Sequence, residues 1–483
     1  MITTRLLSVF TFTVVKFVFF FYLCSSINLL AQNWPMANCN RERTSWAQYE
    51  TVLKPPLEKT MEFSLFGGYQ SGMSFYNGML FVSIELDFNR FVAFNYNDTT
   101  KVWHFDIPNS EGSVNVVPAV NDTLVLCGGQ NGLGLYALDK LTGVEKWFNG
   151  LGSLYSANPI IDSSRIYIVR DTILCLNIHN GSVIWSKSFP RRATPAVDDK
   201  QIYVCGDRRL IAFDKFTGDI KWQIYNSQRS YASIAVDNNF LYTYSNDSIL
   251  AITKDSGKVH WVSPNTYGTV SDLSNGAIAI SDSFLCYAIW ENADNKGQLH
   301  TIDKITGSHL WQYTFDTTGT FTPMIANGTV YIVQWVTASV WGFDLRTGDI
   351  VFYDNSEQYL GQPIAANNTL YVGALGKVTA FNNLSTDINF SFVEKQKLFK
   401  LFPNYPNPFN PSTTISFFLP HDDFVKLAVY NIQGEEVEVL INNELPAGLH
   451  KTLLNASTLA SGVYFYKITA SNFNRTKKIA LIK

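Results

Sequence analysis

Short hydrophobic runs of strand length recur along the chain, and no run after residue 31 approaches the roughly 20 residues of a membrane-spanning helix. Many of these runs follow a proline and an Asp or Asn turn, as in Pro159 before the run 166–169 and Pro363 before 370–372. Proline is tolerated at the first residue of a strand, and Asp, Asn and Gly favour the turn that leaves it. The pattern therefore predicts an all-β chain of many short strands.

A turn pattern repeats about every 40 residues, a period typical of propellers and solenoids. A well-formed copy places Asp139, Thr142, Gly143 and Trp147 at fixed spacing. The other copies end at Trp103, Trp185, Trp222, Trp261, Trp311 and Phe352. Asp can bond its own backbone two residues on, and Gly accepts a positive φ, so each copy predicts a hairpin. We expect each Trp, on the strand after the turn, to pack between neighbouring sheets with its N–H on a carbonyl.

Two more strands precede each turn, and four short strands per repeat are typical of a propeller blade. An eighth repeat begins at Pro363 and stops after 378–381 without its last strand, while a matching strand at 60–66 stands before the first copy. If that strand completes the last blade, the ring closes on its own ends and leaves no free sheet edge. We predict an eight-bladed β-propeller over residues 32–382, with seven blades as the alternative.

The N-terminal 31 residues have the pattern of an export signal. Arg5 and Lys16 precede the apolar run 17–23, which continues to Ala31. We predict a signal peptide at 1–31, cleaved after Ala31, which leaves a mature chain without an integral membrane span. The alternative is an uncleaved membrane anchor, although Lys16 interrupts the longer run.

The C-terminal hundred residues change pattern. Residues 383–398 are polar and predict a linker. A segment rich in proline and asparagine follows at 401–414, and then six alternating strands separated by glycine turns such as Gln433-Gly434. We predict a small antiparallel, immunoglobulin-like β-sandwich over residues 399–483.

Composition excludes several classes of partner and site. The net charge is −3, which gives no reason to expect nucleic acid or an anionic membrane as a partner. Five cysteines follow the predicted signal peptide at irregular spacing, and four of them lie within apolar runs, so we interpret these four as core residues. The histidines are scattered, so no metal site is expected. We expect a monomer.

Two family resemblances follow from these motifs. The repeats resemble the pyrroloquinoline-quinone-type (PQQ-like) propeller family, and Trp34-Pro35-Met36 is similar to the segment that often opens such domains. The segments 404–413, 461–464 and 477–478 closely resemble the type A sorting domain of type IX secretion substrates. The second resemblance implies an interaction with the type IX secretion machinery. It also implies a final location that is secreted or on the outer-membrane exterior of a Gram-negative bacterium.

The resemblance to quinoproteins raises the question of catalysis. The PQQ-dependent alcohol dehydrogenases have an adjacent-cysteine disulfide, a calcium site and a catalytic Asp, whereas no two cysteines are adjacent here. The carboxylate pairs Asp198-Asp199 and Asp422-Asp423 lie in a repeated turn and in the sorting domain. We expect no catalytic residues and no cofactor, and favour a non-catalytic binding or scaffold protein. The alternative is a PQQ-dependent dehydrogenase or a hydrolase with its site at the channel mouth.

One group of residues is a candidate ligand site. In a propeller, loops between sheets and loops between a sheet's second and third strands emerge on one face. That face would carry six arginines over one sector: Arg170, Arg191, Arg192, Arg208, Arg209 and Arg229. Arginine binds carboxylates and phosphates through two parallel hydrogen bonds, so an acidic glycan, an anionic surface polymer or an acidic protein is the expected ligand. The alternative is that these exposed turns simply carry charge. Trp290 and Trp335, beside the long loops of the sixth blade, could stack on sugar rings, although core packing is the alternative.

Overall fold

The structure is a computed structural model. It describes residues 33–482 except 66–67, 86–89, 109–115, 130–133, 155–156, 190–192, 207, 226–230, 246–247, 265–277, 292–295, 318, 320–321, 384–399, 402–403, 405–406, 420–421, 447 and 472. The chain divides into two units, Met1–Ser385 and Thr386–Lys483. The predicted signal peptide at 1–31 and almost all of the predicted linker lie outside the described residues. Residue 383, placed in the linker by the sequence pattern, ends a strand instead.

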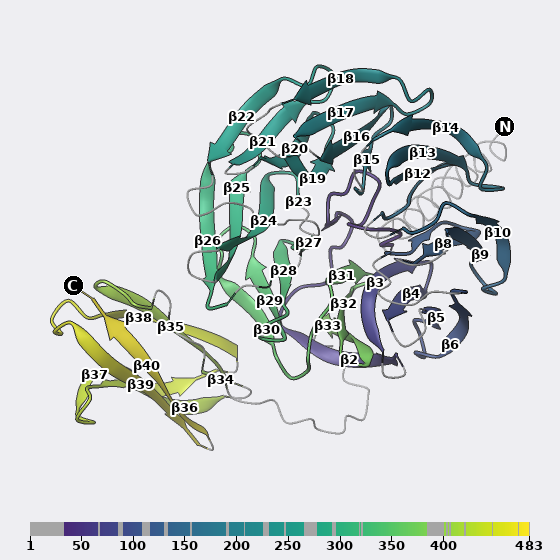
Figure 1. The fold of residues 1–483 in the computed structure, drawn as a ribbon. Coiled ribbons are helices and arrows are strands. Elements are labelled where there is room, and N and C mark those ends of the chain that lie inside the picture. Colours follow the sequence, from purple (N-terminus) through teal and green to yellow (C-terminus); the bar gives the residue numbers. More distant parts are fainter. Residues whose placement is uncertain are drawn as a thin grey trace, which may run out of the picture. The chain divides into compact units, whose positions relative to one another are not determined.

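The first unit is a ring of antiparallel sheets, seen face-on in Figure 1. Its described residues form seven four-stranded sheets and one five-stranded sheet, numbered 1 to 8 along the chain. In each sheet the first strand lies toward the ring centre and the last lies outside (Figure 1).

Sheets 1 and 2 consist of β3 (Tyr69–Tyr76), β4 (Met79–Glu85), β5 (Arg90–Asn95), β6 (Lys101–Asp106), β7 (Ala119–Val120), β8 (Leu124–Gly128), β9 (Leu135–Asp139) and β10 (Glu145–Asn149). Sheets 3 and 4 consist of β11 (Ile160–Asp162), β12 (Arg165–Val169), β13 (Thr172–Asn177), β14 (Val183–Ser188), β15 (Ala196–Val197), β16 (Gln201–Gly206), β17 (Arg209–Asp214) and β18 (Ile220–Tyr225).

Sheets 5 and 6 consist of β19 (Tyr231–Val236), β20 (Phe240–Ser245), β21 (Ser248–Thr253), β22 (Val259–Pro264), β23 (Ala279–Ile280), β24 (Phe284–Glu291), β25 (Lys296–Asp303) and β26 (His309–Phe315). Sheet 7 consists of β27 (Met324–Ala326), β28 (Thr329–Gln334), β29 (Ser339–Asp344) and β30 (Ile350–Asp354), joined by the short parallel strand β1 (Trp46–Ala47). Sheet 8 consists of β31 (Ile364–Ala366), β32 (Thr369–Ala374), β33 (Lys377–Asn383) and β2 (Leu57–Ser64).

Sheet 8 is built from both ends of the first unit. β2 pairs antiparallel with β33, with Met61 opposite Ala380 and Phe63 opposite Val378. The predicted pairing with 378–381 is therefore confirmed for residues 60–64. The observed strand begins three residues earlier, at Leu57, and ends at Ser64, while residue 66 lies outside the described residues. The two ends of the unit are thus held together by a hydrogen-bonded ladder.

One tryptophan contact repeats at the seams, which we define as the interfaces between consecutive sheets. Each indole Nε1 donates to the carbonyl of the residue that follows the turn Asp or its equivalent in the next sheet, over distances of 2.5 to 3.2 Å. The pairs are Trp103–Lys140, Trp147–Ile178, Trp185–Lys215, Trp222–Lys254, Trp261–Lys304 and Trp311–Leu345. The predicted role of these tryptophans is confirmed.

The turn glycine is required at the same contact. Gly218 has a φ of +74°, and a Cβ there would lie 2.7 Å from the ring of Trp185. Sheet 1 shows the converse. The sheet that precedes it in the ring is sheet 8, whose outer strand β2 contains no Trp. The β5–β6 turn of sheet 1 carries Thr99, at φ 59°, in the position that glycine holds in the other copies.

The segment 33–54 follows the inner edge of the ring, and we name it the strap. Six backbone N–H groups of first strands donate to carbonyls of the strap. They belong to Phe75, Val120, Val197, Val236, Ile280 and Ile325, and their acceptors are Trp34, Pro35, Arg41, Glu42, Thr44 and Ser45. One of the six residues, Phe75, also accepts a hydrogen bond in return from the N–H of Trp34. Each backbone bond contributes on the order of 1 kcal/mol. The strap is therefore part of the fold and not a loose leader.

The second unit contains two sheets among its described residues. One is β34 (Lys400–Leu401), β35 (Ser412–Leu419) and β38 (Gly448–Asn455). The other is β37 (Glu436–Leu445), β36 (Asp423–Tyr430), β39 (Gly462–Ala470) and β40 (Phe473–Leu481). Residues from both, including Ile415, Phe417, Leu427 and Tyr466, form one buried cluster. All six predicted strands are present.

In the described part of the chain, no helix has the length and apolar character needed to cross a membrane.

Candidate functional site

The predicted arginine site is described in part. Arg170 lies in the β12–β13 hairpin of sheet 3, and Arg208 and Arg209 lie in the β16–β17 hairpin of sheet 4. The guanidinium of Arg170 lies beside Gly152, which is in the connection between sheets 2 and 3. Both Arg208 and Arg209 are exposed, and Arg209 lies over the ring of Tyr225 with its guanidinium carbon 6.0 Å from the ring centroid. Arg191, Arg192 and Arg229 lie outside the described residues.

The two predicted tryptophans differ in what the structure describes. Trp335 lies in the β28–β29 turn of sheet 7, where its backbone N–H donates to Gly319 and its side chain remains 44% exposed. The backbone of Trp290 pairs with Gly297 within sheet 6, and its side chain is outside the described set. Trp335 is therefore available to a ligand.

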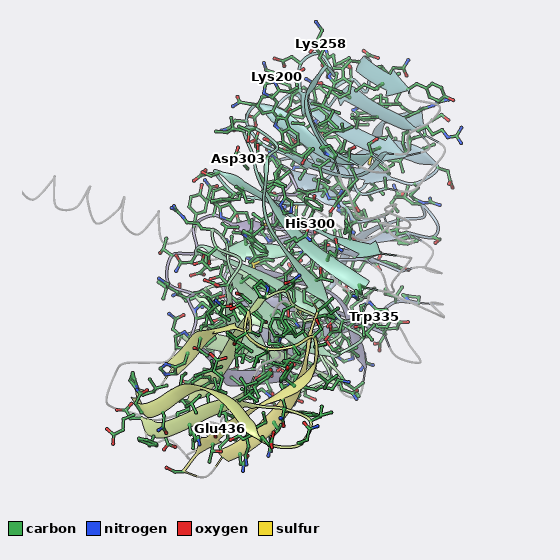
Figure 2. The ribbon with its side chains drawn as sticks, turned by 90° about the vertical axis from the view of Figure 1, so that its left-hand side faces the viewer. Lys200, Lys258, His300, Asp303, Trp335 and Glu436 are labelled. Atoms are coloured by element: carbon green, nitrogen blue, oxygen red, sulfur yellow. The ribbon has the colours of Figure 1, made fainter. Side chains whose placement is uncertain are left out.

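The ring has two faces of different character. Figure 2 views the ring from the side and places Asp303, in a β25–β26 turn, opposite Trp335. The face with Asp303 also carries the strap and is named the strap face. The face with Trp335 carries the hairpins of Arg170 and Arg208 and is named the hairpin face. Because the strap contacts the inner strands of the ring, the strap face of the channel is lined by the chain's own N-terminal segment.

Charged strap residues fix the strap to the ring. The Arg41 guanidinium donates to Asp162 of sheet 3 and Asp199 of sheet 4, both at 2.5 Å. The buried Glu50 carboxylate accepts hydrogen bonds from the backbone N–H groups of Val52, Leu53 and Asn368. Including these side-chain contacts, the strap bonds to every one of sheets 1 to 8.

Arg43 extends from the strap into the ring. Its Nη1 donates to the carbonyl of Thr194 at 2.8 Å. With the Asn38 amide oriented so that its oxygen faces Arg43, Nε and Nη2 donate to that oxygen at 3.1 and 2.9 Å. Burial lowers the pKa of Arg43 to about 10, so the guanidinium remains charged at neutral pH. The channel interior here is polar and cationic.

Lysine–aspartate ion pairs close three of the seams on the strap face. Lys215 pairs with Asp162 at 2.6 Å, Lys254 with Asp198 at 2.9 Å and Lys304 with Asp237 at 3.1 Å. Each lysine follows the turn Asp or its equivalent, Thr253, in one sheet, and each aspartate ends the first strand, or directly follows it, in the sheet before. We name these ion pairs the latches.

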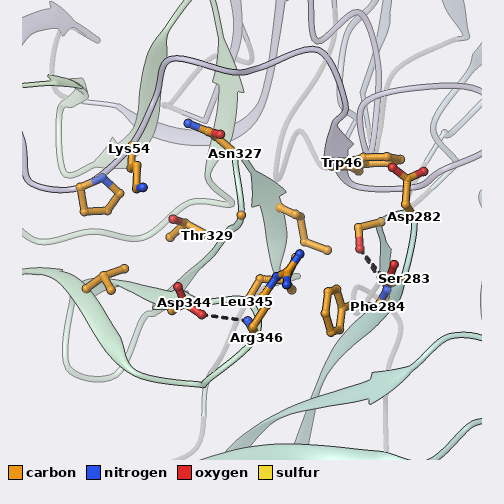
Figure 3. Close-up of a pocket in the computed structure, with 15 residues that line it drawn as sticks. Trp46, Lys54, Asp282, Ser283, Phe284, Asn327, Thr329, Asp344, Leu345 and Arg346 are labelled. Atoms are coloured by element: carbon orange, nitrogen blue, oxygen red, sulfur yellow. Dashed lines mark hydrogen bonds between the residues drawn. The ribbon is translucent and has the colours of Figure 1, made fainter.

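The seam between sheets 6 and 7 has no latch, because its equivalent positions are Leu345 and Ser281. A pocket of about 400 Å³ lies there on the strap face, as Figure 3 shows. Sheet 6 contributes Asp282 and Phe284, sheet 7 contributes Thr329 and Arg346, and the strap contributes Trp46 and Lys54. We name it the seam pocket.

The strap positions the aromatic wall of the seam pocket. Trp46 is in β1, which pairs in parallel with β27, and the carbonyl of Ser45 accepts a hydrogen bond from the N–H of Ile325 at 2.9 Å. On the opposite wall, the Asp344 carboxylate accepts from the backbone N–H of Arg346 and fixes the turn that carries it. One wall is therefore held by backbone pairing and the other by a backbone N–H bond to the Asp344 side chain.

One buried imidazole lies between sheets 5 and 6. The ring of His300 stacks on Tyr287 with centroids 5.0 Å apart, and its nitrogens contact Gln298 at 2.8 Å and His309 at 3.3 Å. Burial and the neighbouring His309 lower the pKa of His300 to about 3. It is neutral at physiological pH and packs as a core residue.

The five described cysteines are buried and form no disulfide, which confirms the interpretation of Cys127, Cys175, Cys205 and Cys286 as core residues. Burial raises the pKa of Cys205 and Cys286 to about 12, so both thiols stay protonated. Within the described residues, no three His, Cys, Asp or Glu side chains lie close enough together to hold a metal.

The sequence analysis did not identify the strap beyond Trp34–Met36, and it did not identify the seam pocket. The strap binds mainly through backbone carbonyls, which leave no pattern of side chains. The one feature of the sequence that could have indicated the pocket is Trp46, an aromatic residue in the polar segment 41–54.

Two family models match the chain. The model described as "Outer membrane protein assembly factor BamB" matches residues 40–173, 150–269 and 245–387, and the model described as "Secretion system C-terminal sorting domain" matches 404–483. No curated protein matches the chain in sequence.

Solved structures of propellers are similar in fold. BamB from Moraxella catarrhalis is 19% identical with a TM-score of 0.54, over 68% of this chain and 99% of that chain. The quinohemoprotein alcohol dehydrogenase from Comamonas testosteroni is 12% identical with a TM-score of 0.57, over 75% and 82%. The computationally designed protein Ika8 is also 12% identical with a TM-score of 0.57, over 67% and 99%.

These identities establish the fold and leave activity open. Over residues 40–387 the chain belongs to the PQQ-like repeat family of BamB-like propellers, and over 404–483 it carries a type IX secretion sorting domain.

Proposed function

We propose that this chain is a secreted or cell-surface binding or scaffold protein without catalytic activity, exported by the type IX secretion machinery. The observation that carries the proposal is the order of its parts, a propeller over 40–387 followed by a sorting domain over 404–483. We assign a signal peptide to 1–31, an eight-bladed propeller to 32–383, a linker to 384–398 and an immunoglobulin-like sorting domain to 399–483. The protein then resides on the outer-membrane exterior of a Gram-negative bacterium or in the medium.

The side chains of the propeller support binding over catalysis. Groups that could act as nucleophile or base, such as the Cys286 thiol and the His300 imidazole, are buried, with pKa values that keep them neutral. The aspartates of the latches are held in ion pairs. A catalytic acid or base needs access to substrate and a pKa near the working pH, and the Cys286 thiol and the His300 imidazole have neither.

The hairpin face is the proposed surface for a large ligand. Its described residues include the exposed Arg208, Arg209 and Trp335. Guanidinium groups bind carboxylates strongly, and an exposed indole provides flat contact area. An acidic glycan or an acidic protein is the ligand class that fits these groups.

The test is export of the chain with and without its tail. The full chain and a chain ending at residue 398 are expressed in a bacterium with an active type IX system and in a mutant of it that lacks the system. The full chain is expected at the surface or in the medium of the active strain only, and the shortened chain in the periplasm of both. Surface delivery of the shortened chain would contradict the proposal.

A further inference from the structure

The charged groups around the seam pocket differ from those at the latched seams in having no partner. Asp199, at the second turn position of sheet 4, binds Arg41 of the strap. Asp282 holds the same position in sheet 6 and is exposed, and no ion pair to it occurs within the described residues. Arg346 and Lys54 are also exposed, and neither forms an ion pair with any described residue. Among the described residues, the pocket thus presents two cations and one carboxylate without an ion pair, and its second carboxylate, Asp344, is occupied by backbone N–H groups.

The aromatic wall adds a flat apolar surface to these charges. Trp46 and Phe284 are both only partly buried, so their rings remain accessible from the pocket. In Figure 3, Trp46 and Asp282 lie toward one end of the pocket and Lys54 toward the other. The face of an indole carries negative charge density and attracts the weakly positive C–H groups of a saturated ring.

We propose that the seam pocket binds a uronic-acid residue of an acidic polysaccharide. The sugar ring packs on Trp46, its carboxylate binds Arg346, and its hydroxyls donate to Asp282, while Lys54 at the other end of the pocket binds the carboxylate of the next uronic-acid residue. A neutral sugar would leave both cations without a partner, and an acidic peptide would not use the flat wall. The volume of about 400 Å³ is in the range of small-molecule sites, roughly 300–1,000 Å³.

The pocket is preformed rather than assembled by the ligand. Backbone pairing of β1 with β27 holds Trp46, and the Asp344 turn holds Arg346. The side chain of Asn327, another wall residue, donates to the carbonyl of Thr51 and fixes the strap just before Lys54. Walls fixed in this way reduce the ordering cost of binding.

The experiment measures binding of trigalacturonic acid to purified chain 32–483 by calorimetry at low ionic strength. The matched ligand is the fully methyl-esterified trisaccharide, which keeps the rings and removes the charge. We expect the acid to bind on the order of tenfold more tightly than the ester, and its affinity to fall as salt is raised. Equal affinities for acid and ester, or no binding of the acid, would overturn the proposal.

Variants locate the site. Arg346→Gln is expected to weaken binding of the acid on the order of tenfold while leaving the ester unaffected. Lys258→Gln removes an exposed cation two seams away on the same face and is the control, with no expected change. Equal losses in both variants would show diffuse electrostatic attraction and remove the pocket from the explanation.

Trp46 is tested with two substitutions because it is also part of the strap. Trp46→Phe keeps a flat ring and is expected to retain binding within about threefold, whereas Trp46→Ala is expected to lose it. An unchanged affinity in a folded Trp46→Ala variant would contradict the stacking. An acidic peptide such as acetyl-Asp-Glu-Asp-amide that binds more tightly than trigalacturonate would replace the sugar by a protein ligand.

The proposal rests on the proposed surface location only for access to such polysaccharides. Binding is measured on purified protein, and export is measured in cells. Failure of one therefore does not imply failure of the other.

Discussion

The seam between sheets 4 and 5 and the seam between sheets 6 and 7 share the tryptophan contact but differ on the strap face. The first is closed by the ion pair of Lys254 and Asp198. The second has Leu345 and Ser281 at those positions and opens into the seam pocket. Sheets 6 and 7 are joined by the Trp311–Gly348 contact and a buried hydrophobic cluster without a latch, so the residues at the latch position there are not needed to close the seam.

The largest expected effect tests the contact that both seams share. Gly218→Val would add a branched side chain at a φ of +74° and within 2.7 Å of the Trp185 ring. Left-handed strain of about 1–2 kcal/mol and overpacking of about 1–3 kcal/mol predict a loss of roughly 3 kcal/mol in unfolding free energy. Urea unfolding measures it.

Thr99→Val is the control for that substitution. Thr99 holds the same turn position in sheet 1, where the preceding strand β2 has no Trp. The unfolding free energy of the Thr99→Val protein is expected to differ from that of the unsubstituted protein by less than about 1 kcal/mol. Similar losses in both variants would show that contact with the indole is not what makes the Gly218→Val substitution costly.

A smaller effect is expected from opening a latched seam. Lys215→Met removes the most buried latch lysine, 7% exposed, and leaves the Asp162 carboxylate with Arg41 as its remaining cation. Breaking a fully buried pair costs about 3–5 kcal/mol, and the remaining partner reduces this to roughly 2 kcal/mol. Lys187→Met breaks the exposed pair with Asp219 and should cost less than about 0.5 kcal/mol. Equal midpoints for the two variants in urea would show that the latch is not structural.

Acid should act on the seam between sheets 5 and 6. His300 has a pKa lowered to about 3, so between pH 6.5 and 3 the unfolded chain binds a proton that the folded chain does not. Stability due to this group is complete above pH 6.5 and declines by up to about 1.4 kcal/mol per pH unit as the pH falls. In His300→Gln that part of the slope should disappear from thermal unfolding measured at a series of pH values. An unchanged slope would show that the imidazole is accessible to protons in the folded state.

The smallest effect on stability comes from converting the open seam into a latched one. Ser281→Asp with Leu345→Lys places the latch pair between sheets 6 and 7, where it would fill the seam pocket. The unfolding free energy should change by no more than about 1 kcal/mol, because the desolvation of the two charges offsets most of their attraction. Calorimetry should show loss of trigalacturonate binding. Retained binding in a folded double variant would separate the ligand site from the latch position.

The features that the sequence predicted share one property, which is that each is repeated or local. The spacing from Asp139 to Trp147 predicted a turn and an inter-sheet contact, and both are present. The unpaired strands at the two ends of the repeat array predicted that β2 would complete sheet 8. The arginine group on the hairpin face stays a prediction, because only Arg170, Arg208 and Arg209 are described.

The strap and the seam pocket could not be predicted in the same way. Carbonyls of residues such as Arg41 and Glu42 make the bonds that hold the strap, and every residue type has a carbonyl. The pocket arises at Ser281 and Leu345, which are ordinary residues in isolation. They become informative only when compared with the latch positions of neighbouring sheets.

The sequence by itself determined the repeating unit, the kind of strand that each repeat forms and the tail that directs export, because these follow from turn chemistry and periodic hydrophobicity within short stretches of chain. Only the tertiary structure decided which repeats keep a latch, where the strap runs and which charges are left without a partner. These depend on side chains from distant segments, such as Trp46, Asp282 and Arg346, that meet only after the ring has closed.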